Sequence, residues 1–143
     1  MTLKIKYLLF IVIIFTCCAS SRDYEVIYKI REQNDNLSNS KLNIEFDSSA
    51  VLFFEHGFEK TKVNIKRNNL VIYENTISTE MDVLLADVKN LGAISENLNN
   101  TYVSINNGKY FKIELSKKYK YAGINYFRDT VLVEYLNYYP IYD

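Results

Sequence analysis

The sequence is poor in the residue types that catalytic and metal sites use. Its 143 residues include one histidine, His56, two cysteines and no tryptophan. Zinc sites need about four imidazole or thiolate ligands, and phosphate-binding loops need clustered glycines, whereas the four glycines here are scattered. The sequence therefore predicts no metal ion and no cofactor, and it does not favour an enzyme.

Charge of either sign is not in excess. The chain has 17 basic and 17 acidic residues. Without residues 1–19, Lys4 and Lys6 are lost, and the remainder carries 15 basic and 17 acidic residues, a net charge of −2. Nucleic-acid-binding domains normally carry a strong positive field. We therefore expect no nucleic-acid partner.

Long apolar runs are missing as well. The apolar run over residues 7–15 is about half as long as a membrane-spanning helix requires. It follows Lys4 and Lys6 and precedes small residues that end at Ser20, which is the layout of a secretory signal peptide. We expect residues 1–19 to be a signal segment and residues 20–143 to form a single exported domain.

The two cysteines, Cys17 and Cys18, stand side by side at the end of this run. The pattern resembles the lipobox of bacterial lipoproteins, in which an apolar residue and small residues precede a cysteine that becomes lipidated. Either cysteine could be the lipidated one, and both alignments depart from the usual pattern. If it is Cys18, Phe15 stands three residues before it, where Leu is typical; if it is Cys17, the bulky Phe15 and Thr16 stand directly before it. The resemblance, which covers at most the N-terminal fifth of the chain, implies that one cysteine carries a lipid that attaches the protein to a membrane.

Two other readings of this segment stay open. In the first, a general signal peptidase cuts after Ala19, so that the mature chain begins at Ser20 and both cysteines are discarded. In the second, the segment is not cleaved and remains as an anchor. In every case the domain has no cysteine for an internal disulfide, although an exported protein could form one. Its stability must come from a hydrophobic core.

Alternation of apolar and polar residues predicts strands along most of the domain. Asn68-Asn69 and Asn106-Asn107-Gly108 interrupt pairs of alternating runs and predict two hairpins, because Asn and Gly tolerate the positive φ of tight turns. The expected strands are residues 24–31, 42–47, 50–55, 61–67, 70–74, 101–105, 109–115, 121–127 and 131–136, with a possible short edge strand in residues 137–143.

One segment breaks this rhythm. Met81, Leu84, Leu85, Val88 and Leu91 recur at helical spacing, with Ser78 or Thr79 as a cap and Gly92 after the end, which predicts a helix. Together these features predict a mainly β fold, a two-sheet antiparallel β-sandwich of about eight strands with one short helix. A closed barrel is the alternative.

Tyrosines crowd the last third of the sequence. The candidates for a ligand-binding surface are Tyr119, Tyr121, Tyr126, Tyr138 and Tyr139, because tyrosine combines a large apolar ring with a polar tip and is favoured at interfaces. Packing inside a sandwich without tryptophan explains the same residues equally simply.

These features favour a non-catalytic binding role at the cell envelope or surface of a bacterium, with a membrane lipid anchor and a protein or glycan partner. The alternative is an accessory lipoprotein with a structural role in a larger envelope complex. A hydrolase, with His56 as general base beside Glu55, is less favoured, because no nucleophile motif accompanies this histidine.

Overall fold

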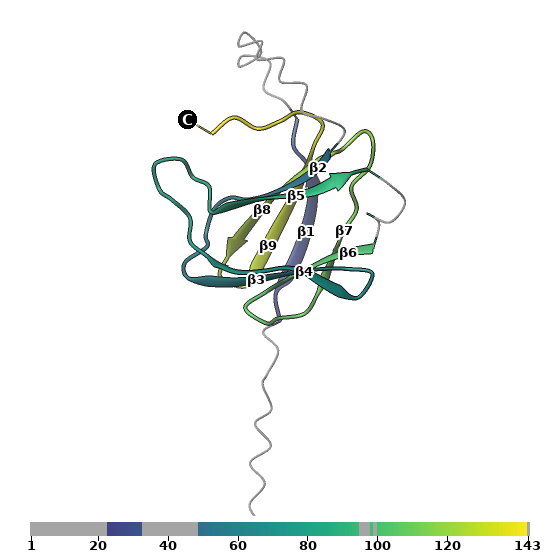
Figure 1. Ribbon diagram of the computed structural model, residues 1–143. Helices are drawn as coiled ribbons and strands as arrows, with labels where there is room; N and C mark the ends of the chain where they lie inside the picture. Colours follow the sequence, from purple (N-terminus) through teal and green to yellow (C-terminus); the bar gives the residue numbers. More distant parts are fainter. Residues whose placement is uncertain (1–22, 33–48, 95–97, 99, 143) are drawn as a thin grey trace, which may run out of the picture.

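The computed structural model describes residues 23–32, 49–94, 98 and 100–142, which fold into two stacked β-sheets (Figure 1). One sheet has five strands in the order β1-β9-β8-β2-β5, and the other has four in the order β4-β3-β6-β7. The predicted mainly β, two-sheet sandwich is confirmed. The nine strands of the described part are β1 Glu25–Ile30, β2 Ser49–Phe54, β3 Thr61–Arg67, β4 Leu70–Ile77, β5 Asp87–Ala93, β6 Thr101–Ile105, β7 Phe111–Ile113, β8 Tyr121–Phe127 and β9 Thr130–Leu136.

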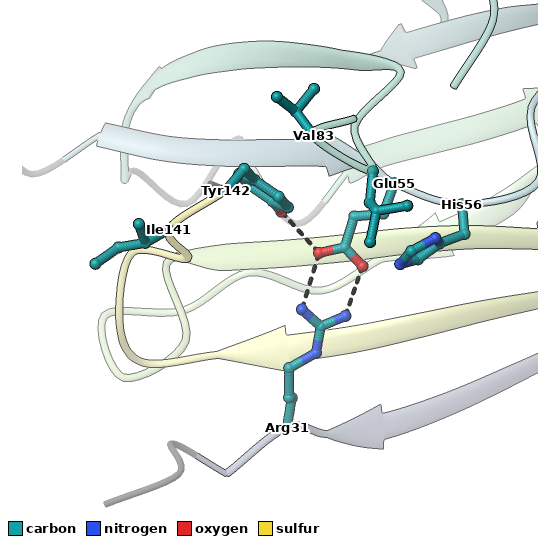
Figure 2. Close-up of a pocket in the computed structure, with 7 residues that line it drawn as sticks. Arg31, Glu55, His56, Val83, Ile141 and Tyr142 are labelled. Atoms are coloured by element: carbon teal, nitrogen blue, oxygen red, sulfur yellow. Dashed lines mark hydrogen bonds and ion pairs between the residues drawn. The ribbon is translucent and has the colours of Figure 1, made fainter. Parts of the chain in front are cut away.

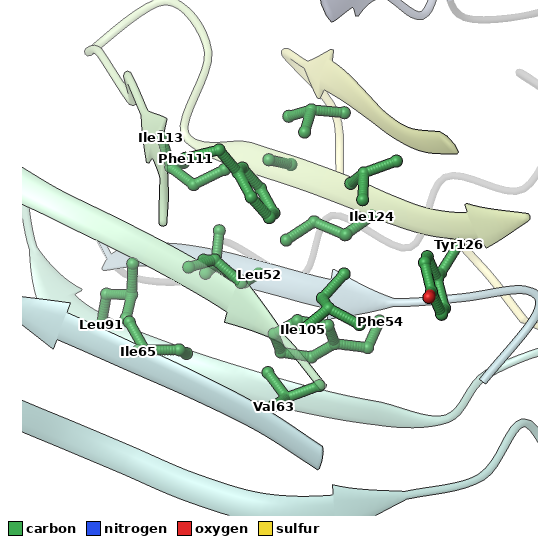
Figure 3. Close-up of a cluster of buried hydrophobic side chains, with 14 of the residues drawn as sticks. Leu52, Phe54, Val63, Ile65, Leu91, Ile105, Phe111, Ile113, Ile124 and Tyr126 are labelled. Carbon is green, nitrogen blue, oxygen red and sulfur yellow. The ribbon is translucent and has the colours of Figure 1, made fainter. Parts of the chain in front are cut away.

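The core lies between the two sheets and is built by every second residue of the strands (Figure 3). Leu52, Phe54 and Ile124 fill it from the five-stranded sheet, and Val63 and Ile65 fill it from the opposite sheet, all with no exposed surface. Each such side chain contributes about 1.5–3 kcal/mol on burial. This core takes the place of the disulfides that the domain lacks.

Three tight turns follow the turn residues of the sequence. Asn68 and Asn69, with φ of 50° and 65°, join β3 to β4, and Asn106 and Asn107, with φ of 50° and 56°, follow β6. Asparagine adopts this left-handed region more readily than other residues that carry a side chain. Both predicted hairpins are confirmed, and Arg128, with φ of 53°, begins a third turn between β8 and β9.

The sheets are mostly antiparallel, as expected, but the five-stranded sheet contains two parallel pairs. β1 pairs with β9 in parallel, and β2 pairs with β8 in parallel. Parallel neighbours need long connections, so the local turn signals of a sequence cannot reveal them. As a result, the first and last strands of the described chain lie side by side.

The predicted helix is also wrong. Residues 81–84 form a turn closed by the bridge between Glu80 and Leu85, and β5 pairs antiparallel with β2. Of the helically spaced residues, Leu91 is buried in the core, but Met81 and Val88 are exposed, so no continuous apolar helix face would have been buried. Pairing with β5 also gives the buried strand β2 a backbone partner on its second side.

The remaining expectations concern the C-terminal segment and residues that the structure does not describe. Residues 137–142 form no strand and instead run back as an irregular segment, contrary to the suggested edge strand. The predicted strand over residues 42–47, the signal segment and Cys17 and Cys18 lie outside the described residues.

Candidate functional site

The outer face of the five-stranded sheet carries a buried carboxylate. Glu55 follows β2 directly, and only 2% of its surface is exposed. Its side chain lies over Gly123 of β8, where an added Cβ would come within 2.8 Å of the Oε2 atom of Glu55. Glycine at this position therefore makes room for the carboxylate to lie against the sheet.

Four hydrogen bonds from three neighbours converge on Glu55, and Figure 2 shows the three that Arg31 and Tyr142 donate. Arg31 donates through Nη1 to Oε1 at 2.8 Å and through Nη2 to Oε2 at 2.5 Å. The Tyr142 hydroxyl donates to Oε1 at 2.7 Å, and the Asn125 amide donates to Oε2 at 2.8 Å. Arg31 also donates to the carboxylate of Glu134. The network thus joins the segments after β1 and β2, strands β8 and β9, and the C-terminal segment.

The network fixes the protonation state of its members. Burial alone would raise the pKa of Glu55, but the hydrogen bonds from Arg31 and Tyr142 and the positive charge of Arg31 outweigh burial and lower this pKa below its usual value. The hydrogen bond to Glu55 raises the pKa of Arg31. Burial, and next the negative charge of Glu55, raises the pKa of Tyr142. At neutral pH the Glu55 carboxylate is ionised and the Tyr142 phenol keeps its proton.

A cleft of about 320 Å³ opens beside this network. Figure 2 shows the side chains of Val83, Ile141 and His56 around the carboxylate. The guanidinium of Arg31 and the carboxylates of Glu55 and Glu134 together carry a net charge of −1. The residues that line the cleft are Arg31, Glu55, His56, Val83, Leu84, Ile141 and Tyr142.

The pairing of Glu55 bears on the hydrolase hypothesis. An ionised carboxylate has about four lone-pair sites, and Arg31, Tyr142 and Asn125 supply four donors to it. The carboxylate is therefore saturated and does not orient the imidazole of His56, as a general base would require. His56 is held instead through its backbone N–H, which donates to Oδ1 of Asn125 at 3.1 Å.

The predicted tyrosines divide between the two faces of the five-stranded sheet. Tyr126 is buried in the core between the sheets, whereas Tyr121 is buried on the outer face. Tyr138 and Tyr139 pack from the C-terminal segment against the outer cluster that contains Tyr121, and Tyr119 lies in a loop under Lys118. The structure thus places Tyr121, Tyr138 and Tyr139 in one outer cluster and Tyr126 in the core, and Tyr119 belongs to neither cluster.

These outer tyrosines cover a second, smaller apolar cluster. Phe53 contacts Tyr139 and Tyr142 with ring centroids 5.2 Å and 5.7 Å apart, and Tyr121 contacts Tyr139 at 5.5 Å. Much of the ring surface is therefore used for packing within the protein. The C-terminal segment acts as a cover over Phe53 and, through Tyr142, over Glu55.

Sequence reasoning missed the network partners of Glu55. Arg31 lies far in the chain from Asn125 and Glu134, which come from the hairpin of β8 and β9, and only the folded sheet brings the three together. One signal was present: Asn125 and Glu134 are polar residues inside otherwise apolar strands, where a polar side chain needs a partner.

No group of three or more His, Cys, Asp or Glu side chains among the described residues could hold a metal ion. Nor does the part of the chain described here contain a helix that is long and apolar enough to cross a membrane. No family model, curated protein or solved structure matches the chain. The protein is a two-sheet β-sandwich, and its function has to be argued from its own residues.

Proposed function

We propose that this protein is an exported β-sandwich of the bacterial cell envelope, anchored by a lipid on Cys17 or Cys18, with a non-catalytic binding role. The cysteine pair after a short apolar run supports the anchor. Glu25, the first residue of β1, follows Cys18 by seven residues, which span at most ~25 Å. An anchored sandwich would therefore lie close to the membrane surface.

The saturated carboxylate of Glu55 carries the non-catalytic part of the proposal. Glu55 lines the cleft beside His56, yet its lone pairs are all engaged by Arg31, Asn125 and Tyr142. A cleft with a fixed polar floor and apolar walls at Val83 and Ile141 suits the binding of a side chain or sugar better than the activation of water. The partner is a protein or a glycan.

The anchor is tested by the mass of the mature N-terminal peptide from the native host, with and without lipid extraction. We expect a lipid adduct on one cysteine and its loss in either Cys17→Ser or Cys18→Ser, but not in both. Membrane fractionation of the same two variants provides the matched control. An unmodified N-terminus at Ser20 would overturn the anchor and leave the domain free in solution.

An accessory role in a larger envelope complex is the second candidate. The observation in its favour is that β1, a six-residue edge strand, is unpaired on one side within the described residues. Such an edge can pair with another chain. An accessory protein should co-purify with a defined partner in stoichiometric amount, whereas a glycan binder should retain isolated sugars without any partner.

A further inference from the structure

The four edge strands of the sandwich differ in how they are protected. β1 and β5 are the edges of one sheet, and β4 and β7 are the edges of the other. An edge strand presents unpaired N–H and C=O groups that can pair with another chain, and proteins usually block such edges. In this protein three edges carry a blocking feature.

The edge of β7 is covered by tyrosine hydroxyls. Tyr28 donates to the carbonyl of Lys112 at 3.0 Å, and the hydroxyl of Tyr135 accepts from the N–H of Glu114 at 3.0 Å. These bonds occupy backbone groups that an added strand would need. Pairing at β7 is therefore blocked.

β5 and β4 are protected by their own side chains and by an irregularity. In β5 the side chain of Asp87 accepts from the N–H of Val88, and that of Asn90 accepts from the N–H of Gly92, both at 2.7 Å. In β4 the side chain of Asn75 accepts from the N–H of Thr76 at 2.9 Å. The pairing of β3 with β4 also shifts register after Ile65, and a bulge of this kind twists an edge away from partners.

β1 carries no comparable cap among the described residues. The N–H groups of Glu25 and Arg31 donate to β9 or to the turn before it, at 2.8 and 3.0 Å. Ladder bonds alternate along a strand, so Val26, Tyr28 and Ile30 direct their N–H and C=O groups to the free side.

The side chains of β1 are also uncovered at this edge. Tyr28 and Ile30 lie on the same strand face as Val26, which packs against the core, yet they are 46% and 58% exposed. A groove of about 400 Å³ lies beside them, lined by Tyr28, Lys112, Glu114 and Tyr135. The free backbone groups, the exposed apolar side chains and the groove all lie on one side of the sandwich.

We propose that this edge pairs with β1 of a second copy of the same chain, antiparallel and about a two-fold axis at Ile27. In this register Val26 lies opposite Tyr28 of the other copy, which forms backbone hydrogen bonds in both directions. Glu25 of each copy lies opposite Lys29 of the other copy, so the dimer contains this pair twice. The five-stranded sheets of two copies join into one continuous sheet.

The charge pattern identifies the occupant as a second copy. Glu25 and Lys29 are both exposed and flank Ile27 at equal distance in the chain. Cross-strand pairs of opposite charge stabilise a sheet, and like charges directly opposite each other destabilise it. Among pairings of β1 with itself, only the antiparallel one centred on Ile27 matches both Glu25 and Lys29 with the opposite charge. This inference does not depend on the lipid anchor.

Disulfide trapping at the axis tests the pairing. Ile27 would occupy a non-hydrogen-bonded pair with Cα atoms about 4.5 Å apart, within the range of a disulfide. The Ile27→Cys variant, expressed from the full-length chain and purified in mature form, should therefore give a covalent dimer with a mild oxidant on a non-reducing gel. Val71→Cys, on the bulged edge strand β4, and the unsubstituted protein are the matched controls, and on this denaturing gel both should show no covalent dimer.

Charge reversal tests the register. Glu25→Lys or Lys29→Glu alone, added to Ile27→Cys, should weaken dimerisation about tenfold, and the double reversal should restore it. Mixing the two single reversals should give a heterodimer. Sedimentation velocity of the same charge variants without the added cysteine should give the same order of dimer stability.

Three outcomes would overturn the proposal. The first is a monomeric protein in sedimentation together with no more cross-linking at residue 27 than at residue 71. The second is a dimer whose stability does not respond to the charge reversals. The third is an adduct of Ile27→Cys with a different host protein in place of itself, which would assign the edge to a foreign strand.

Discussion

Replacing Arg31 by methionine should destabilise the protein by about 3 kcal/mol at neutral pH. Breaking a buried ion pair by removing one partner typically costs about 3–5 kcal/mol, because an uncompensated charge stays buried. Glu55 is 2% exposed and keeps its bonds from Asn125 and Tyr142, while Arg31 itself is 27% exposed. The lower end of the range is therefore expected.

The pH dependence of this loss follows from the pKa of Glu55. In the native protein this pKa is lowered, so the ionised pair stabilises the fold above the unfolded carboxyl pKa of about 4.3 and ceases to do so as the pH falls through the folded value. In the Arg31→Met variant burial outweighs the remaining donors and raises the pKa of Glu55. Acidification then favours the folded variant, and the stability deficit should shrink between pH 7 and pH 5.

Urea unfolding followed by circular dichroism measures both effects. Lys117→Met, an exposed lysine, controls for the loss of one positive charge. Adding Glu55→Gln to Arg31→Met should recover part of the stability, since the buried charge is then gone. A loss below about 1 kcal/mol at pH 7, or a deficit that grows on acidification, would refute the argument.

Three further outcomes are expected. Gly57→Ala should lower the free energy of unfolding by about 3 kcal/mol or more, because the φ of Gly57 is 84° and an added Cβ would lie 1.7 Å from the carbonyl oxygen of Tyr126. Gly92→Ala should lower it by only about 1 kcal/mol, because Gly92 has a similar φ of 82° but open space around it. Urea unfolding of the two variants measures the difference. Gly123→Ala should displace the Glu55 carboxylate, because an added Cβ would occupy its place. Arg31→Met should then cause a smaller loss of stability in the Gly123→Ala background than in the unsubstituted protein, which a double-mutant cycle measures. Burial and the hydrogen bond to Asp87 raise the pKa of Tyr73 to about 12. The contribution of this tyrosine to stability is therefore complete below pH 10 and is lost as the pH rises to 12, and Tyr73→Phe should remove one step near pH 12 from the tyrosinate absorbance titration.

Local patterns predicted the strands well because they depend on neighbouring residues. Alternation located β1, β8 and β9, and the asparagine turns located two hairpins. The parallel pairs of β1 with β9 and of β2 with β8 depend on contacts far apart in the chain, which no local pattern encodes. The helix prediction failed because it rested on the apolar spacing of residues 81–91 alone. Residues 87–93 of this segment instead form β5, which pairs with the buried strand β2.

The candidate site could be predicted only in part for the same reason. His56 and Glu55 stood out as neighbours in the sequence, but the chemistry of Glu55 is decided by Arg31 and Tyr142 from the two ends of the described chain. Crowding of tyrosines in the sequence likewise could not reveal that Tyr126 faces the core while Tyr121 lies on the outer face.

The two ends of the described chain meet on one carboxylate, and this couples them. Arg31 follows β1, the strand nearest to the proposed anchor, and Tyr142 is the last described residue; both donate to Oε1 of Glu55. In the described part β1 pairs with β9 alone. The bonds of Arg31 to Glu55 and Glu134 therefore attach the end of β1 to the outer face of the sheet as well. A change at β1 that displaces Arg31, such as pairing with a second copy, would therefore remove a hydrogen-bond partner of Glu55 and so affect the carboxylate that Tyr142 of the C-terminal segment binds.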